Sequence, residues 1–172
     1  MTPMMRTVLR MLLLTLPVAA GASSVMPQGH LIRYPIPNST FPIAAAVEVP
    51  SGKTMVYLSG QMGLPPKDAN APKDAPGFTG DTKAQTITAL TNIKTQLERM
   101  HLGVGDVVKM QVFLVADKAK GNTLDFAGFM GGYTQFFGTR EQPNLPSRSA
   151  VQVMALVSPG ALVEIEVAAV RP

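Results

Sequence analysis

The segment from Leu145 to Ala168, LPSRSAVQVMALVSPGALVEIEVA, limits the possible folds more than any other part of the chain. Its two apolar runs alternate as β-strands do, and the Ser158-Pro159 pair between them fits a turn, so the sequence predicts a β-hairpin. Arg148 lies on a face of the first strand that is otherwise uncharged, and Glu164 and Glu166 share one face of the second. We expect these three charged side chains on the same side of the sheet.

Two roles are open for these charges. The expected hairpin places Arg148 opposite Ala168, about four strand residues from Glu164 and roughly 13 Å away, so a direct ion pair is not expected. A solvated sheet face is the simpler role. The alternative is a binding site, because a guanidinium offers a planar pair of donors that suits a carboxylate, and a glutamate can position a water or move a proton.

The remaining patterns predict an α+β fold. Two segments have helical spacing of apolar residues: one begins after Asp81 as N-cap and ends at His101-Leu102-Gly103, with Gly103 expected in the left-handed conformation, and the other covers about 123–137. Strands are expected at 30–36, 45–49, 54–59 and 107–115, with 45–59 as a second hairpin. This order predicts two helices on one face of a mostly antiparallel sheet, whose other face a symmetric oligomer would cover.

Composition excludes several classes of site. The chain has no cysteine, which removes disulfides, thiolate nucleophiles and cysteine-based metal sites, and its two histidines, His30 and His101, cannot form a zinc motif such as HExxH, so we expect no metal site of these kinds. Two of the 15 basic residues, Arg6 and Arg10, lie in the first 22 residues, which contain no acidic residue. The other residues have 13 basic and 11 acidic side chains, and this net charge of +2 does not predict a nucleic-acid partner.

Residues 1–22 have the pattern of a secretory signal peptide. A basic start is followed by about a dozen apolar residues and by Ala20-Gly21-Ala22, which fits a cleavage site. We therefore expect an exported protein, periplasmic or secreted, with a single domain at 23–172 and no membrane span after cleavage. The Pro-rich stretch at 64–79, where PKDA occurs twice, is expected to be an exposed loop, with a lid over a site as the alternative.

Seven short motifs, in this order, resemble the RidA (YjgF/YER057c/UK114) family. They are SGQ at 59–61, GD at 80–81, QTITALTNIK at 85–94, DVVK at 106–109, VFL at 112–114, PSRS at 146–149 and GALVEIEVAAV at 160–170. The resemblance covers nearly all of the chain from about Leu31. It implies a chorismate mutase-like fold of the bacillus type, assembled as a homotrimer with ligand clefts between subunits. It also implies hydrolysis of reactive enamines and imines, such as 2-aminoacrylate, to keto acids and ammonia without a cofactor.

The resemblance also assigns roles to residues. It implies that Arg148 holds the carboxylate of an imino or keto acid and that Glu164 orients the attacking water. Pocket-lining roles fall on the residues Ser59, Gly60, Ile43, Met130 and Phe137. The family segment G-P-Y-S-Q is Phe41-Pro42-Ile43-Ala44-Ala45 here, so Ile43 stands where the family has a tyrosine, and Met130 stands where an asparagine is common. Both changes predict a more apolar pocket and a larger or more apolar substrate.

Three functions remain open at this point. The first is an exported deaminase of the RidA type, which the joint presence of Arg148 and Glu164 favours. The second is a trimeric protein that binds small carboxylates or apolar ligands without turnover, which Ile43, Met130 and export favour. The third is a partner-binding, chaperone-like trimer, in which the apolar sheet and the 64–79 loop would matter more than Arg148.

Overall fold

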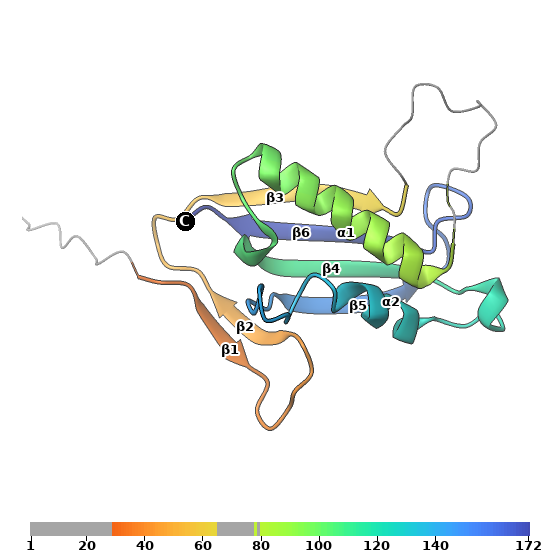
Figure 1. The fold of residues 1–172 in the computed structure, drawn as a ribbon, viewed down its shortest axis with the longest axis horizontal. Helices are drawn as coiled ribbons and strands as arrows, with labels where there is room; N and C mark the ends of the chain where they lie inside the picture. Colours follow the sequence, from red (N-terminus) through yellow and green to blue (C-terminus); the bar gives the residue numbers. More distant parts are fainter. Residues whose placement is uncertain (1–28, 65–77, 79) are drawn as a thin grey trace, which may run out of the picture.

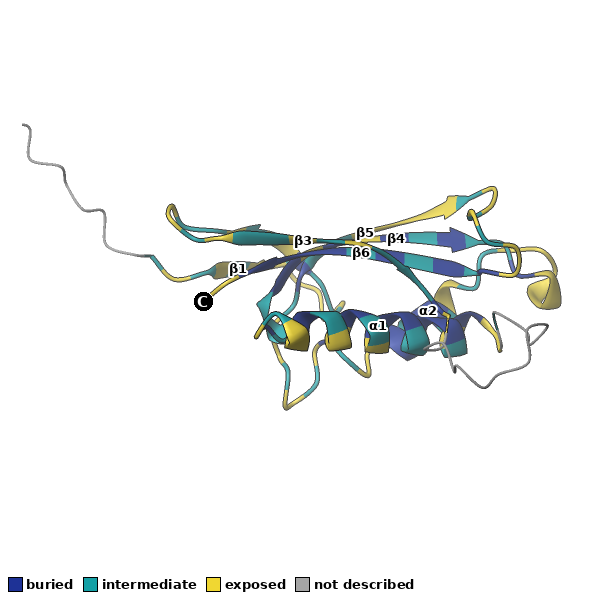
Figure 2. Cartoon of the chain, turned by 90° about the horizontal axis from the view of Figure 1, so that it is seen from above, coloured by how far each residue is buried: buried dark blue, intermediate teal, exposed yellow. Residues whose placement is uncertain are grey.

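A computed structural model describes residues 29–64, 78 and 80–172, and in this part the chain forms a sheet covered on one face by two helices (Figures 1 and 2). The expected α+β architecture is confirmed. The expected signal peptide and most of the 64–79 loop lie outside the described residues. The strands are β1 (Ile32–Pro35), β2 (Ala44–Glu48), β3 (Met55–Met62), β4 (Val107–Val115), β5 (Ser147–Val153) and β6 (Val163–Val170). The helices are α1 (Thr82–Arg99) and α2 (Phe126–Tyr133), with short 3₁₀ turns at Val104–Asp106 and Lys118–Lys120.

The strands form one mixed sheet in the order β1-β2-β5-β4-β6-β3. Three pairs are antiparallel, β1–β2, β3–β6 and β4–β6, and two are parallel, β2–β5 and β4–β5. Both expected hairpins are wrong: β4 lies between β5 and β6, and β2 and β3 lie far apart in the sheet (Figure 1). The reason is that β4, VVKMQVFLV, is apolar enough to take a central position, where neighbours pair with both of its edges.

Helix α1 begins and ends as its sequence dictates, with one correction. The Asp81 carboxylate accepts a hydrogen bond from the Ala84 amide at 2.9 Å, which confirms the predicted N-cap. At the other end Leu102 N donates to Leu97 O at 2.9 Å, as in a Schellman motif, and the left-handed residue is His101 with φ 58°. Gly103, which was expected to be that residue, has φ −123°. The helix already ends at Arg99, so the left-handed residue comes two positions before Gly103.

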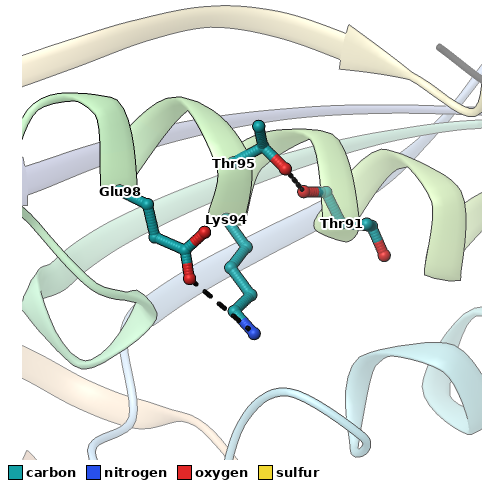
Figure 3. A network of polar contacts seen from close by, with 4 residues as sticks. All are labelled: Thr91, Lys94, Thr95 and Glu98. Atoms are coloured by element: carbon teal, nitrogen blue, oxygen red, sulfur yellow. Dashed lines mark hydrogen bonds and ion pairs between the residues drawn. The ribbon is translucent and has the colours of Figure 1, made fainter.

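The two faces of α1 differ sharply. Leu90, Ile93 and Leu97 are fully buried against the sheet. On the exposed side, Lys94 Nζ lies 3.8 Å from Glu98 Oε1 and the Thr95 hydroxyl donates to Thr91 O (Figure 3). An exposed ion pair of this kind adds little to stability, so the buried face holds α1 in place.

Helix α2 is shorter than the predicted 123–137 segment. The Asp125 carboxylate caps it by accepting from Gly128 N at 2.9 Å, and the helix ends at Tyr133, just after Gly131 and Gly132. Two adjacent glycines weaken a helix because glycine loses more conformational freedom than any other residue when it becomes helical. Aromatic residues of the 123–137 segment nevertheless pack into the core: Phe129 and Tyr133 of the helix are fully buried, and Phe137 is buried just after it.

The face of the sheet away from the helices is open (Figure 2). Tyr57 and Val151 on this face are 77% and 49% exposed, and Met154 and Val157, just beyond the end of β5, are 99% and 88% exposed. Apolar exposure on this scale is typical of a surface that another molecule covers. None of the helices in the described part of the chain is long and apolar enough to cross a membrane.

Candidate functional site

Arg148 lies on the helix-covered face of the sheet. The register of β4 and β5 pairs it with Met110, which is fully buried under the helices, and neighbouring strand residues in register share a face. Its guanidinium carbon lies near the centres of four aromatic rings, which we call the aromatic cage: Tyr133 at 4.3 Å, Phe129 at 4.9 Å, Phe41 at 5.5 Å and Phe126 at 5.9 Å. Ring faces attract a cation electrostatically, so the cage holds the charge without neutralising it.

The cage has an inner and an outer layer. Phe129 and Tyr133 are 0% exposed and form the inner pair. Phe41 and Phe126 are 40% and 36% exposed and stack on each other with their ring centres 6.4 Å apart, which makes them the outer pair. The outer pair therefore borders the guanidinium on a side that solvent reaches.

The polar groups of Arg148 are only partly satisfied. Nη2 donates to the Met130 sulfur at 3.3 Å, which is a weak acceptor. Nη1 is buried and has no hydrogen-bond partner among the described residues. Burial lowers the pKa of Arg148, an effect that Tyr133 opposes, yet an arginine keeps its charge in proteins. A half-buried cation with an unused, buried donor favours an anionic acceptor, and a carboxylate fits this need.

Tyr133 connects the cage to the chain that enters β2. Its hydroxyl donates to Pro42 O at 2.8 Å, which fixes the segment that carries Phe41. Burial raises the pKa of Tyr133 to about 12, although the charge of Arg148 opposes this shift. The phenol is therefore a neutral donor at physiological pH.

Glu164 belongs to a different part of the molecule. It pairs in register with Phe113 of β4 and Met62 of β3, on the open face. A β-bulge between Leu58 and Gln61 brings Gly60 against it, so that a Cβ at Gly60 would lie 2.8 Å from Glu164 Cδ and nearer still to Oε1. Bulges often change the direction of side chains beside active sites. At this position only glycine leaves room for the Glu164 carboxylate.

Ser59 and Gly60 form the loop of this bulge. The Gln61 side-chain amide donates to both of their carbonyl groups, each at 3.2 Å. Ser59 is exposed and borders a groove on the open face together with Tyr57, Leu58, Lys109, Gln111, Glu166, Val167 and Ala168. Glu164 and Glu166 border a second groove there with Phe113, Val153, Ala155, Leu156 and Val157.

The structure contradicts the expectation that Arg148 and the glutamates share one side of the sheet. The expectation assumed a hairpin in which β5 and β6 are neighbours, but both pair with β4 instead. Arg148 is aligned with Met110 and Glu164 with Phe113, three positions apart on β4, so they point to opposite faces. Within one chain the site consists of two separate halves: an arginine half under the helices and a glutamate half on the open face.

The chain matches a known protein family over most of its length. The model of the family described as Endoribonuclease L-PSP matches residues 37–171. A putative reactive intermediate deaminase, TdcF, from Escherichia coli K12 is 34% identical over 135 residues, which cover 78% of this chain and 91% of TdcF. The 2-iminobutanoate/2-iminopropanoate deaminase of the same organism is 35% identical over 117 residues, which cover 68% of this chain and 80% of that protein. The chain belongs to the RidA family.

Solved structures agree with this RidA-family membership. The crystal structure of Escherichia coli TdcF with bound serine has a TM-score of 0.54 and 33% identity, covering 76% of this chain and 93% of TdcF. The Rid-family protein YyfB from Yersinia pestis has a TM-score of 0.60 and 26% identity, covering 80% of this chain and 96% of YyfB. The mixed six-stranded sheet with two helices is therefore a RidA-type fold.

Of the three other residues that the RidA resemblance assigned to the pocket, Met130 and Phe137 lie in the arginine half or behind it, and Ile43 borders a separate groove with Arg33 and Tyr34. Met130 contacts Arg148 directly, as described. Ile43 is partly buried against the main core, two residues from Phe41. Phe137 is 1% exposed and stacks on Tyr133 with their ring centres 5.0 Å apart, so it supports the cage from behind.

Sequence reasoning missed the aromatic cage. The aromatic residues of the 123–137 segment, taken as a helical stripe, predict core packing, which is correct for the inner pair but incomplete for Phe126. Phe41 was noted only as part of a family segment. The one signal was the spacing of Phe126, Phe129 and Tyr133 by three and four residues, which places all three on one side of a helix.

Other polar features of the described residues have structural roles. A cavity of about 520 Å³ near the C-terminus has Arg33 in its wall, but this guanidinium already donates to Gly105 O, Val107 O and Leu145 O. Burial lowers the pKa of Arg33, an effect that Asp106 opposes. No cluster of three or more His, Asp or Glu residues that could hold a metal occurs in the described part of the chain.

Proposed function

We propose that this RidA-family protein is a deaminase that hydrolyses reactive imines or enamines of amino acids to keto acids and ammonia. The observation that carries the proposal is the buried, unpartnered Nη1 of Arg148, which is the group that a substrate carboxylate would bind. The relatives named as reactive intermediate deaminase and 2-iminobutanoate/2-iminopropanoate deaminase support the same reaction class. The glutamate half supplies the second group that the reaction needs.

The complete site needs two copies of the chain. Arg148 and Glu164 point to opposite faces of the sheet, so one subunit's arginine half would face the glutamate half of a neighbour. The exposed apolar residues on and beside the open face, Tyr57, Val151, Met154 and Val157, support an interface there. We propose a homotrimer with three such sites, in accord with the family resemblance.

The chemistry requires positioning and a proton relay. An enamine first becomes its imine tautomer, whose carbon is electrophilic. Arg148 holds the carboxylate, and Glu164 accepts a proton from a water as its oxygen attacks that carbon. Glu164 passes this proton to the imine nitrogen, which gives a neutral carbinolamine. The hydroxyl proton of this adduct is then transferred to the nitrogen as the C–N bond breaks, so that ammonia leaves and the keto acid remains.

A panel of imino acids tests this proposal. An amino-acid oxidase would generate imines from alanine, leucine and phenylalanine in the presence of the purified protein, and keto-acid release would be compared with the spontaneous rate. We expect acceleration that Arg148→Ala and Glu164→Gln each abolish. No acceleration for any imine would refute the deaminase function.

A second candidate is a trimer that binds carboxylates without turnover. It is favoured by the contact of Arg148 with a methionine sulfur, which offers no proton relay, and by the bound serine in the TdcF crystal structure, which indicates that this relative holds a small carboxylate. Carboxylate binding that depends on Arg148, together with no turnover of the panel, would establish this alternative.

We also propose that residues 1–22 direct export. The support is the basic start, the short apolar run and the Ala20-Gly21-Ala22 site in the sequence. Expression in a Gram-negative host, followed by fractionation and N-terminal sequencing, should give a periplasmic protein that begins at Ser23. A cytoplasmic protein that keeps residue 1 would refute export.

A further inference from the structure

Phe41 is an exposed ring held in a fixed position over the arginine half. Its amide N–H donates to Ser39 Oγ at 3.1 Å, and its carbonyl accepts from Ile43 N at 2.8 Å. The next residue, Pro42, accepts the Tyr133 hydroxyl through its carbonyl. Three hydrogen bonds around one residue in a loop define its backbone, so the ring is presented at one place.

We propose that Phe41 determines substrate specificity by packing against the substrate side chain, so that the site prefers aromatic and large apolar imino acids to small ones. The inference rests on the proposed function, because it concerns the same arginine half. It adds a residue to which the family resemblance gives no role: the position of Phe41 corresponds to the glycine of the family segment G-P-Y-S-Q.

The cage decides from which side a ligand reaches Arg148. The inner pair, Phe129 and Tyr133, is completely buried and closes the side toward the core. Phe41 and Phe126 border the solvent side at 5.5 and 5.9 Å from the guanidinium carbon. A carboxylate that approaches Nη1 along this side therefore passes beside the outer pair.

The rest of the ligand then lies against aromatic surface. An α-imino acid carries its side chain two bonds from the carboxylate carbon, so a side chain longer than a methyl group extends along the rings that border the entrance. Phe41, at 40% exposure, offers the larger free area of the outer pair. Ring-to-ring contact of this kind is worth more than apolar area alone, which favours a phenyl group over a methyl group.

Binding of two carboxylates that cannot react tests the inference separately from catalysis. Isothermal titration would compare phenylacetate with acetate on the full-length protein, on Phe41→Ala, and on Phe41→Tyr as the conservative control. We expect the wild type to bind phenylacetate at least about tenfold more tightly than acetate. Phe41→Ala should reduce this ratio to about twofold or less, by weakening phenylacetate binding more than acetate binding, whereas Phe41→Tyr should keep it.

The outcomes separate the inference from the proposed function. An unchanged ratio in Phe41→Ala, or equal binding of both ligands by the wild type, overturns the inference and leaves the deaminase proposal intact. Binding of neither ligand by the wild type overturns the carboxylate site itself, and with it both proposals. If Phe41→Ala does not fold, Phe41→Leu keeps the apolar volume without the ring, and its ratio should fall below that of Phe41→Tyr.

Discussion

Arg148 and Glu164 point to opposite faces of one sheet, although only β4 separates the strands that carry them. Arg148 is aligned with Met110 and Glu164 with Phe113, and an odd separation along a strand means opposite sides. The two groups that the proposed reaction needs can therefore meet only when the helix-side arginine of one subunit approaches the open face of another. This relationship makes the subunit origin of each group testable.

Mixed trimers should recover activity that neither variant has alone. We expect Arg148→Ala and Glu164→Ala homotrimers to be inactive. Every heterotrimer of the two variants should have about a third of wild-type activity, because one of its three shared sites combines an intact arginine with an intact glutamate. The measurement is the activity per heterotrimer, which is purified by means of a different affinity tag on each variant.

The control is the double variant Arg148→Ala/Glu164→Ala co-expressed with the wild type. If each site were built within one subunit, the mixed single variants would have no intact site, and activity would stay at the level of the homotrimers. The double-variant mixture should retain activity under either arrangement, so it checks that mixed trimers assemble and work.

Gly60→Ala should damage catalysis without damaging the fold. A Cβ at this bulge would lie 2.8 Å from Glu164 Cδ, and the carboxylate is the part that can rotate away. A misplacement of a catalytic group by about 1 Å can lower the rate roughly 100-fold, so we expect kcat to fall by about tenfold or more with KM changed little. Steady-state kinetics together with a thermal melt would measure both effects.

A double-variant cycle gives the control for this change. Glu164→Ala is expected to be inactive, so the thermal melt is the readout here. Gly60→Ala added to Glu164→Ala should leave the melting temperature unchanged, because the clashing side chain is already gone. A lower melting temperature in the double variant would mean that Gly60→Ala disturbs the bulge itself and not only the position of Glu164.

Sequence patterns predicted single elements far better than the relations between them. The apolar run at 107–115 became β4 at Val107–Val115, and Asp81 caps α1 as expected. The alternation of a strand determines which of its residues share a face, but it says nothing about which strand lies beside it. Both expected hairpins failed for this reason, and the relative side of Arg148 and Glu164 failed with them.

The contents of the arginine half were harder to predict. The sequence indicates Arg148 because it is the only charge in an apolar strand. The rings around it come from α2 and from Phe41, and Phe41 lies more than 100 residues before Arg148 in the chain. Contacts at such a separation depend on the packing of helix on sheet. The periodicity of a single sequence does not predict such long-range contacts.

Adjacent glycines in α2 should respond in opposite ways to alanine. A Cβ at Gly132 would lie 2.8 Å from Thr86 Cβ on α1 and 3.1 Å from the Lys83 carbonyl, so α1 must shift. We expect Gly132→Ala to lower the free energy of unfolding by about 1–3 kcal/mol. Gly131→Ala meets only the flexible Lys83 side chain, at 3.4 Å, and should raise it by about 0.5 kcal/mol through helix propensity.

Urea unfolding of both glycine variants at one fixed protein concentration checks this pair, because assembly makes the stability of an oligomer depend on concentration. Equal effects of the two substitutions would show that α1 and α2 are not in close contact at Gly132.

Tyr133 should make the stability of the protein depend on pH in the alkaline range. Burial raises its pKa from 10.0 to about 12, so between these values the unfolded chain releases a proton that the folded chain keeps. The contribution of Tyr133 to stability is complete below pH 10 and is lost as pH rises toward 12, at up to about 1.4 kcal/mol per pH unit. Tyr133→Phe removes this ionisation and also leaves the Pro42 carbonyl without its donor, which costs about 1 kcal/mol at pH 8.

The wild type should therefore lose stability relative to Tyr133→Phe as pH rises from 9 to 11.5, and the two free energies of unfolding should cross once this loss exceeds about 1 kcal/mol. Urea titrations at pH 8, 9, 10, 11 and 11.5 measure this difference, and subtracting the two proteins removes the contribution of groups that titrate alike in both. A difference that stays constant over the whole range would mean that Tyr133 ionises equally in the folded and unfolded chain. The phenol would then be open to solvent, and the inner layer of the cage would not seal Arg148 from the core side.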